Sequence, residues 1–256
     1  MKTIYIPSKG RTGYPITSRL LESHGVPFVV VVDPSELSQY KKIIGKPGKV
    51  ISVDLDDQGL PAARSWIKRY STMIGEDYHW QLEDDISQFF FRRESKGMRK
   101  ITPAEALEAI ETEVFKFENI SIASPDHNSW PPNPDEPVKV NGLPHHAALI
   151  NNATDIFWRQ FLYEDVDFAL QSLSKKYCTM LFKHIRLATP APKAHAGGQT
   201  ERYGDDEKTM AHMECIANEW PTLTVKRLAS GKPQLRFNKI WSTFTQRPRP
   251  ARNFVS

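Results

Sequence analysis

Cysteine is scarce in this sequence, and long apolar runs are missing. Two cysteines, Cys178 and Cys215, are too few for a disulfide framework or a thiolate zinc site, so we expect two buried reduced thiols. The most apolar stretch, residues 27–32, is far shorter than the ~20 residues of a membrane span. Lys9 and Arg11 interrupt any signal-peptide core at the start. We therefore expect a soluble, cytoplasmic protein with no membrane partner.

The composition is that of a globular protein, and its charge is uneven. The 256 residues are 39% hydrophobic and 25% charged, which fits one large domain or one with a small appendage. The net charge is only +4, but from Lys183 onward thirteen Lys and Arg face six Asp and Glu, giving +7 and leaving −3 for residues 1–182. This basic end indicates either a polyanionic partner such as nucleic acid or only a solvated surface.

The first half alternates short apolar runs with helical patterns, which is the order expected of a mostly parallel sheet covered by helices. The run FVVVV lacks polar alternation, as a strand buried on both faces does. The sequence therefore predicts an α/β fold. The expected strands are residues 3–7, 27–33, 49–54, 78–82 and 119–124.

Helices are predicted where apolar residues recur at helical spacing. The clearest begins at Thr102, which is followed by a proline at the first helical position and by Glu105, a capping-box pair. A mobile loop is expected over residues 188–203. The expected helices are residues 16–25, 60–70, 102–117, 166–177 and 205–220.

An acidic cluster, Glu83-Asp84-Asp85, directly follows the predicted buried strand 78–82. In open α/β sheets, ligands bind at the carboxyl ends of the strands. Alternate residues of an extended segment point the same way, so Glu83 and Asp85 can converge on Mg²⁺ or Mn²⁺ while Asp84 faces elsewhere. The alternative is an acidic turn without a metal.

The order of these motifs resembles that of nucleotide-sugar glycosyltransferases of the GT-A fold. The first strand ends in Ile6-Pro7-Ser8-Lys9-Gly10-Arg11, the segment GLPAARS at residues 59–65 opens a helix, and Glu83-Asp84-Asp85 follows a later strand. In that family the acidic cluster is a DxD motif that binds the metal of the donor diphosphate. Here Glu83 replaces the usual first Asp, and Ser65 replaces the usual Asn of an A-R-N segment.

The resemblance implies a donor site across the strand ends. Asp85 would hold the cation, assisted by Glu83 and by His195, a loop histidine that could equally be an ordinary surface residue. His145-His146 and Asp126-His127 are rival metal or acceptor positions. The implied donor-binding residues are Pro7, Ser8, Arg11, Asp33, Arg64, Asp84, Gly197 and Gly198.

Tyr163-Glu164-Asp165 resembles the family's acceptor-side E-D motif at the start of a helix. In inverting members a carboxylate there removes the proton of the acceptor hydroxyl, which implies Asp165 as the base and Glu164 as its rival. The alternative is a helix N-terminus, where acidic side chains are favoured electrostatically. A retaining enzyme would not need this base, and the choice stays open.

Over residues 1–203 the chain looks most like the TET-associated glycosyltransferases of bacteriophages, which implies a phage enzyme in the host cytoplasm. The resemblance implies a donor, expected to be a UDP-sugar, and an acceptor that is 5-hydroxymethylcytosine or a related hydroxymethylpyrimidine in DNA. Residues 204–256 are expected to be a helical, basic extension packed on the same domain. The expected DNA contacts are Arg247, Arg249 and Arg252.

Two other functions stay open. A nucleotidyltransferase also begins with a strand, a phosphate loop and an acidic metal site, although its first loop is usually richer in glycine than Pro7-Ser8-Lys9-Gly10-Arg11. A non-catalytic DNA-binding module would leave the acidic clusters as solvated turns.

Overall fold

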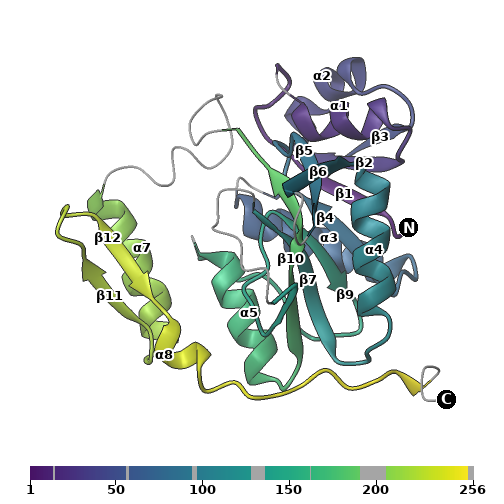
Figure 1. The fold of residues 1–256 in the computed structure, drawn as a ribbon. Helices are drawn as coiled ribbons and strands as arrows, with labels where there is room; N and C mark the ends of the chain where they lie inside the picture. Colours follow the sequence, from purple (N-terminus) through teal and green to yellow (C-terminus); the bar gives the residue numbers. More distant parts are fainter. Residues whose placement is uncertain are drawn as a thin grey trace.

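The computed structural model describes residues 1–13, 15–55, 58–93, 97–127, 136–161, 163–190 and 206–252. Its main body is a ten-stranded mixed sheet between helices (Figure 1). The main path of the sheet has the order β3-β2-β1-β4-β9-β7-β10-β5-β6, and β8 pairs with β10. The predicted α/β fold with a mostly parallel sheet flanked by helices is confirmed.

The first half of the chain forms the parallel part of the sheet. These strands are β1 (Ile4–Pro7), β2 (Phe28–Val32), β3 (Gly48–Ser52) and β4 (Tyr78–Leu82), and all were predicted. Successive side chains of β1 point to opposite faces of the sheet, and both faces are buried. Ile4 and Ile6 pack in the main core, while Tyr5 packs against Ile67 of α3 (Leu60–Met73) on the other face. The other helices of this half are α1 (Ile16–Ser23), the 3-10 turn η1 (Pro34–Glu36) and α2 (Leu37–Ile43).

The second half inserts an antiparallel strand into the sheet. The strand β9 (Ala147–Asn151) lies between β4 and the predicted strand β7 (Ile120–His127), antiparallel to both. Beyond β7 lie β10 (Cys178–Ala188), β5 (Gln88–Arg93) and β6 (Gly97–Ile101), with β8 (Val138–Val140) on β10. Only β7 among these strands was predicted from the sequence.

Two predicted helices cover opposite faces of this half. The helix α4 (Pro103–Val114) begins with the predicted capping box between Thr102 and Glu105, and its apolar stripe joins the main core. The helix α5 (Glu164–Ser174) packs Phe168 against Ile122 and Ile150 on the other face.

The described part of residues 204–256 forms an extension beside α5 (Figure 1). It contains α7 (Asp206–Glu219), the hairpin strands β11 (Thr224–Arg227) and β12 (Pro233–Arg236), and α8 (Asn238–Trp241). Val166 and Leu170 of α5 share a hydrophobic cluster with Met213, Ile216 and Leu235. The extension therefore packs on the main body, while the domain boundary at residues 203 and 204 stays a prediction.

Both cysteines are free thiols, but Cys178 is buried and Cys215 is exposed, so the expectation of two buried thiols holds only for Cys178. Within the described ranges, no helix is long and apolar enough to cross a membrane.

Candidate active site

The predicted motifs meet at one edge of the sheet. β1, β2, β4, β7 and β10 all end there, and we call it the carboxyl edge; the opposite one is the amino edge. Glu83-Asp84-Asp85 follows β4 at this edge, and His127 ends β7 there. The charges of Glu164 and Asp165, in the first turn of α5, interact with those of Arg64 and Glu83. The fold thus brings the two predicted acidic motifs together.

The backbone of the acidic turn is held by Thr17, a fully buried residue at the start of α1. Its Oγ1 donates to Glu83 O at 2.6 Å and accepts from Ile86 N at 2.8 Å. Its N–H donates to Asp84 O at 3.1 Å. One residue, through two side-chain bonds and one backbone bond, therefore holds the turn from Glu83 to Ile86. Nothing in the sequence pattern singled it out.

Both carboxylate oxygens of Glu83 already have cationic or polar partners. Arg64 Nη2 lies 3.3 Å from Oε1, and His146 Nδ1 lies 2.6 Å from Oε2. Burial opposes ionisation of Glu83, but His146 and Arg64 outweigh it and lower its pKa to about 2. Glu83 is therefore a stable anion whose charge is largely compensated by the protein itself.

Asp84 points to the loop after β1. Its Oδ2 accepts a hydrogen bond from Ser8 Oγ at 2.6 Å, and Ser8 Oγ is 2.8 Å from the Tyr40 hydroxyl. Burial raises the pKa of Asp84 to about 6, against the opposing effects of Ser8 and Arg11. Asp84 therefore contacts the loop after β1, whereas Glu83 contacts Arg64 and His146.

Asp85 has an open acceptor. Its Oδ1 is buried and has no hydrogen-bond partner in the described part of the chain. Burial and the charge of Glu83 raise the pKa of Asp85. A buried carboxylate oxygen without a hydrogen-bond partner fits a hard cation such as Mg²⁺ or Mn²⁺. Among the described residues, however, no three His, Cys, Asp or Glu side chains converge as a complete metal site.

The loop after β1 is anchored to η1 and α2. Gly10 has a φ of 67°, in the left-handed region that favours glycine, and its N–H donates to Glu36 Oε1 at 2.8 Å. Arg11 N donates to the Tyr40 hydroxyl at 3.1 Å. Asp33 caps η1, because its Oδ1 accepts from Ser35 N and Ser35 Oγ. These contacts place Pro7, Ser8 and Arg11 at the carboxyl edge beside Asp84.

Glu164, which is buried, and Asp165, which is half-buried, are adjacent carboxylates in the first turn of α5. Burial is the main cause of the raised pKa of each carboxyl group. The charges of Asp165 and Glu83 also raise the pKa of Glu164, and the charge of Glu83 also raises that of Asp165. The Arg64 guanidinium acts in the opposite direction on both. A carboxylate with a raised pKa is a better proton acceptor than an exposed one, which suits the role expected of Asp165.

Three histidines gather beside Glu83. His146 lies between His127 and His145, with ring centroids 4.9 Å from each. His146 has a φ of 58°, which is rare for a residue with a side chain. The sequence indicated these histidines only as rival positions, because neither His145-His146 nor Asp126-His127 has ligand partners at a persuasive spacing in the sequence.

Other predicted residues lie elsewhere. His195, Gly197 and Gly198 fall outside the described residues. Arg247 and Arg249 lie at the amino edge, where their backbones bond to Asn119 just before β7. Arg249 Nε also pairs with Glu118 Oε1 at 3.2 Å. Arg252 is exposed at the end of the same segment. The prediction that these arginines contact DNA stays a prediction.

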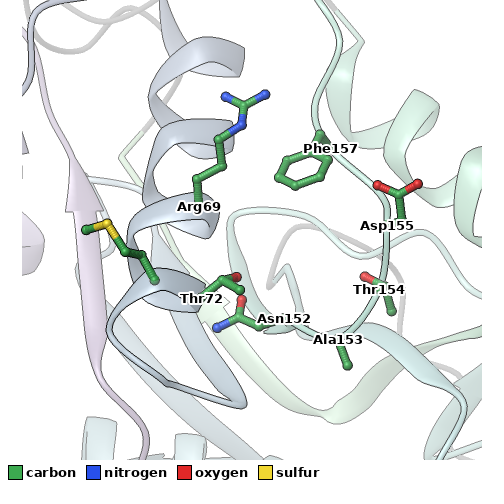
Figure 2. A pocket seen from close by; sticks show the side chains of 8 residues that line it. Arg69, Thr72, Asn152, Ala153, Thr154, Asp155 and Phe157 are labelled. Carbon is green, nitrogen blue, oxygen red and sulfur yellow. The ribbon is translucent and has the colours of Figure 1, made fainter.

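A cavity of about 430 Å³ also lies away from the acidic motifs (Figure 2). Asn152, which lines it, donates its N–H to Asp77 O just before β4, so the cavity is at the amino edge. Arg69 and Phe157 both line the cavity, and the Arg69 guanidinium lies over the Phe157 ring, 4.8 Å from its centre. None of the predicted site residues lines this cavity.

Comparison with known families identifies the chain. The profile of the family "TET-Associated Glycosyltransferase" matches residues 2–198. The chain belongs to the TET-associated glycosyltransferase family. The match covers both acidic motifs and ends before α7, so the described extension lies outside the part shared with the family. No curated protein matches the sequence.

Solved structures overlap this TET-associated glycosyltransferase only loosely. The inositol-1-phosphate CTP transferase of T. maritima has a TM-score of 0.43 and 13% identity, over 78% of this chain and 93% of that chain. The glycosyltransferase GlyE of Streptococcus pneumoniae has a TM-score of 0.35 and 14% identity, over 69% of this chain and 39% of that chain. Mannose-1-phosphate geranyltransferase of Thermus thermophilus has a TM-score of 0.35 and 11% identity, over 96% of this chain and 69% of that chain.

Proposed function

We propose that this protein is a metal-dependent glycosyltransferase that moves a sugar from a nucleotide-sugar, expected to be a UDP-sugar, to a hydroxymethylpyrimidine in DNA. The expected acceptor is 5-hydroxymethylcytosine. The observation that carries the proposal is the meeting of the acidic turn after β4 with Glu164 and Asp165 around Arg64. One site then contains candidate groups for the donor phosphates and for the acceptor hydroxyl.

The donor would lie across the carboxyl edge. Its nucleoside would contact Pro7, Ser8 and Asp33, and its phosphates would lie near Arg11 and Arg64. Arg64 is buried, and its Nε has no hydrogen-bond partner among the described residues. A buried guanidinium with an open donor can bind a phosphate oxygen as charge develops on the leaving diphosphate.

Asp85 would be the main protein ligand of the cation. His195, which follows β10 in the sequence, would add a ligand. The end of β10 lies close to Asp85, because Ala188 O accepts a hydrogen bond at 2.8 Å from the N–H of Ser87, two residues after Asp85. Glu83 would have to lose its contact with His146 or Arg64 in order to bind the metal, so it would be a weaker ligand than Asp85. A bound Mn²⁺ or Mg²⁺ would neutralise the diphosphate and assist its departure.

Asp165 would act on the acceptor in an inverting reaction. The acceptor oxygen attacks the anomeric carbon, the bond from that carbon to the phosphate oxygen breaks, and the hydroxyl proton passes to Asp165. Asp165 Oδ1 accepts from Val166 N at 2.8 Å, which orients the carboxylate at the helix start. Glu164 is the alternative base.

A donor and acceptor screen tests the proposal. Nucleotide-sugars are incubated with Mn²⁺ and with hydroxymethylated or plain DNA, and the products are read by mass. A gain of one sugar only on hydroxymethylated DNA is expected. Transfer only to free sugars or lipids would refute the DNA acceptor, and pyrophosphate release from a nucleoside triphosphate would favour a nucleotidyltransferase.

The acidic turn can be tested separately. Asp85→Asn should abolish sugar transfer and metal-dependent hydrolysis of the donor, with an unchanged circular dichroism spectrum, because it removes the charge that holds the cation. Asp155→Asn is the matched control, since the side chain of Asp155 is 92% exposed and far from this edge. Near-normal activity of Asp85→Asn would refute the proposed metal ligand.

A further inference from the structure

The C-terminal extension has a strongly one-sided charge distribution. From Trp220 to the end of the chain there are eight Lys and Arg residues and no Asp or Glu. Within the described part of the extension, residues 206–252, the acidic side chains all belong to α7, which contains Asp206, Glu207, Glu214 and Glu219. The hairpin β11–β12 therefore presents positive charge without compensation from its own segment.

The hairpin has one buried and one exposed face. Val225 and Leu235, which are paired across the strands, belong to the cluster that packs on α5. Alternate residues of a strand face opposite sides, so Lys226 and Arg236 point away from that cluster. Both are exposed, as is Lys232 in the connecting turn. The outer face of the hairpin is therefore polar and basic.

These three cations have no fixed partner in the described structure. No ion pair among the described residues involves Lys226, Lys232 or Arg236. Arg227, on the inner face, differs because its Nη2 bonds to Glu207 Oε1 at 2.8 Å. Cations that are exposed and not paired can exchange their counterions for the phosphates of a polyanion.

The hairpin is also well placed relative to the site. It packs through the extension on α5, whose first turn contains Glu164 and Asp165. Figure 1 shows its turn on the side where β10 ends, the carboxyl edge. The segment with Arg247 and Arg249 lies at the amino edge instead. A nucleic acid on the hairpin can therefore reach the acidic motifs without crossing the sheet.

We propose that the outer face of the hairpin β11–β12 binds the phosphate backbone of the acceptor DNA through Lys226, Lys232 and Arg236. This inference rests on the proposed DNA acceptor. The contacts are with phosphates, so they supply affinity and orientation without reading the base sequence. The extension, which lies outside the family match, is then a DNA-holding accessory to the shared transferase domain.

The test is DNA binding by the full chain, measured by fluorescence anisotropy with a short labelled duplex of unmodified DNA. Replacing Lys226, Lys232 and Arg236 by Ala together should weaken binding at least tenfold at ~0.1 M salt and lower the log–log salt slope by about 3. The control replaces Lys41, Lys42 and Lys49 by Ala, which removes three exposed cations at the other end of the sheet. Equal binding by the triple hairpin variant and the wild type would overturn the inference.

Activity separates this inference from the proposed function. The hairpin variant should hydrolyse the nucleotide-sugar without DNA at the wild-type rate and show a raised KM for DNA with an unchanged kcat. A wild-type protein that neither hydrolyses nor transfers sugar would refute the function but leave the binding comparison valid. If Ala at Arg247, Arg249 and Arg252 weakens binding and the hairpin variant does not, the DNA lies on the amino edge and the inference is wrong.

Discussion

Thr17→Val should destabilise the protein although it changes the side-chain volume very little. Thr17 is fully buried, and its hydroxyl serves Glu83 O and Ile86 N at 2.6 and 2.8 Å. Valine leaves both backbone groups without a partner, and each buried unsatisfied group costs about 1–3 kcal/mol. We therefore expect a loss of about 2–6 kcal/mol in the free energy of unfolding.

The measurement is urea unfolding of the wild type, Thr17→Val and Thr17→Ser. Serine keeps the hydroxyl and loses only a methyl group, so it should cost about 1 kcal/mol. Because the hydroxyl also fixes the acidic turn, donor hydrolysis should fall in the valine variant and largely persist in the serine variant. A valine variant within about 0.5 kcal/mol of the wild type, or a serine variant as unstable as valine, would refute this account.

Two further predictions concern the stability of the main body. Lys68 is fully buried and donates to Thr154 and Ile156, and burial lowers its pKa to about 8 from 10.5. Between these two pKa values the unfolded chain binds more protons than the folded chain, so the free energy of unfolding should rise with pH. Between pH 7 and 10.5 the wild type should gain up to ~3 kcal/mol relative to the Lys68→Met variant. If the difference in free energy of unfolding between the wild type and Lys68→Met did not change with pH, the lowered pKa of Lys68 would be refuted. Gly48→Ala would place a Cβ 2.5 Å from Phe28 Cζ, so it should cost about 1–3 kcal/mol and lower the Tm, whereas Gly13→Ala, with nothing within 4 Å, should not.

The parallel half of the fold could be predicted because its signals are local. The strands β1 to β4 are short apolar runs between helical patterns, and the capping box at Thr102 depends on residues three apart. The pairing of β9 between β4 and β7 joins residues distant in the chain, and a run such as AALIN has no periodicity that distinguishes a strand from a helix.

The candidate site was predictable to the same extent. Glu83-Asp84-Asp85 follows a predicted strand and Glu164-Asp165 precedes a predicted helix, so both motifs lie at the ends of predicted elements, and the α/β topology places ligand sites at the carboxyl ends of the strands. Thr17 and His146 could not be predicted, because their roles depend on which backbone groups and carboxylates the fold brings to them. Both belong to contacts between segments more than sixty residues apart.

The course of the last residues has a practical consequence. Lys116 O accepts from Ala251 N, and Glu118 N donates to Arg249 O, so the chain leaves the molecule at the side remote from the acidic motifs. A purification tag, fluorophore or surface tether attached after residue 252 would project away from both the acidic motifs and the hairpin. Immobilised protein coupled in this way would keep its reactive face open to long polymers in solution.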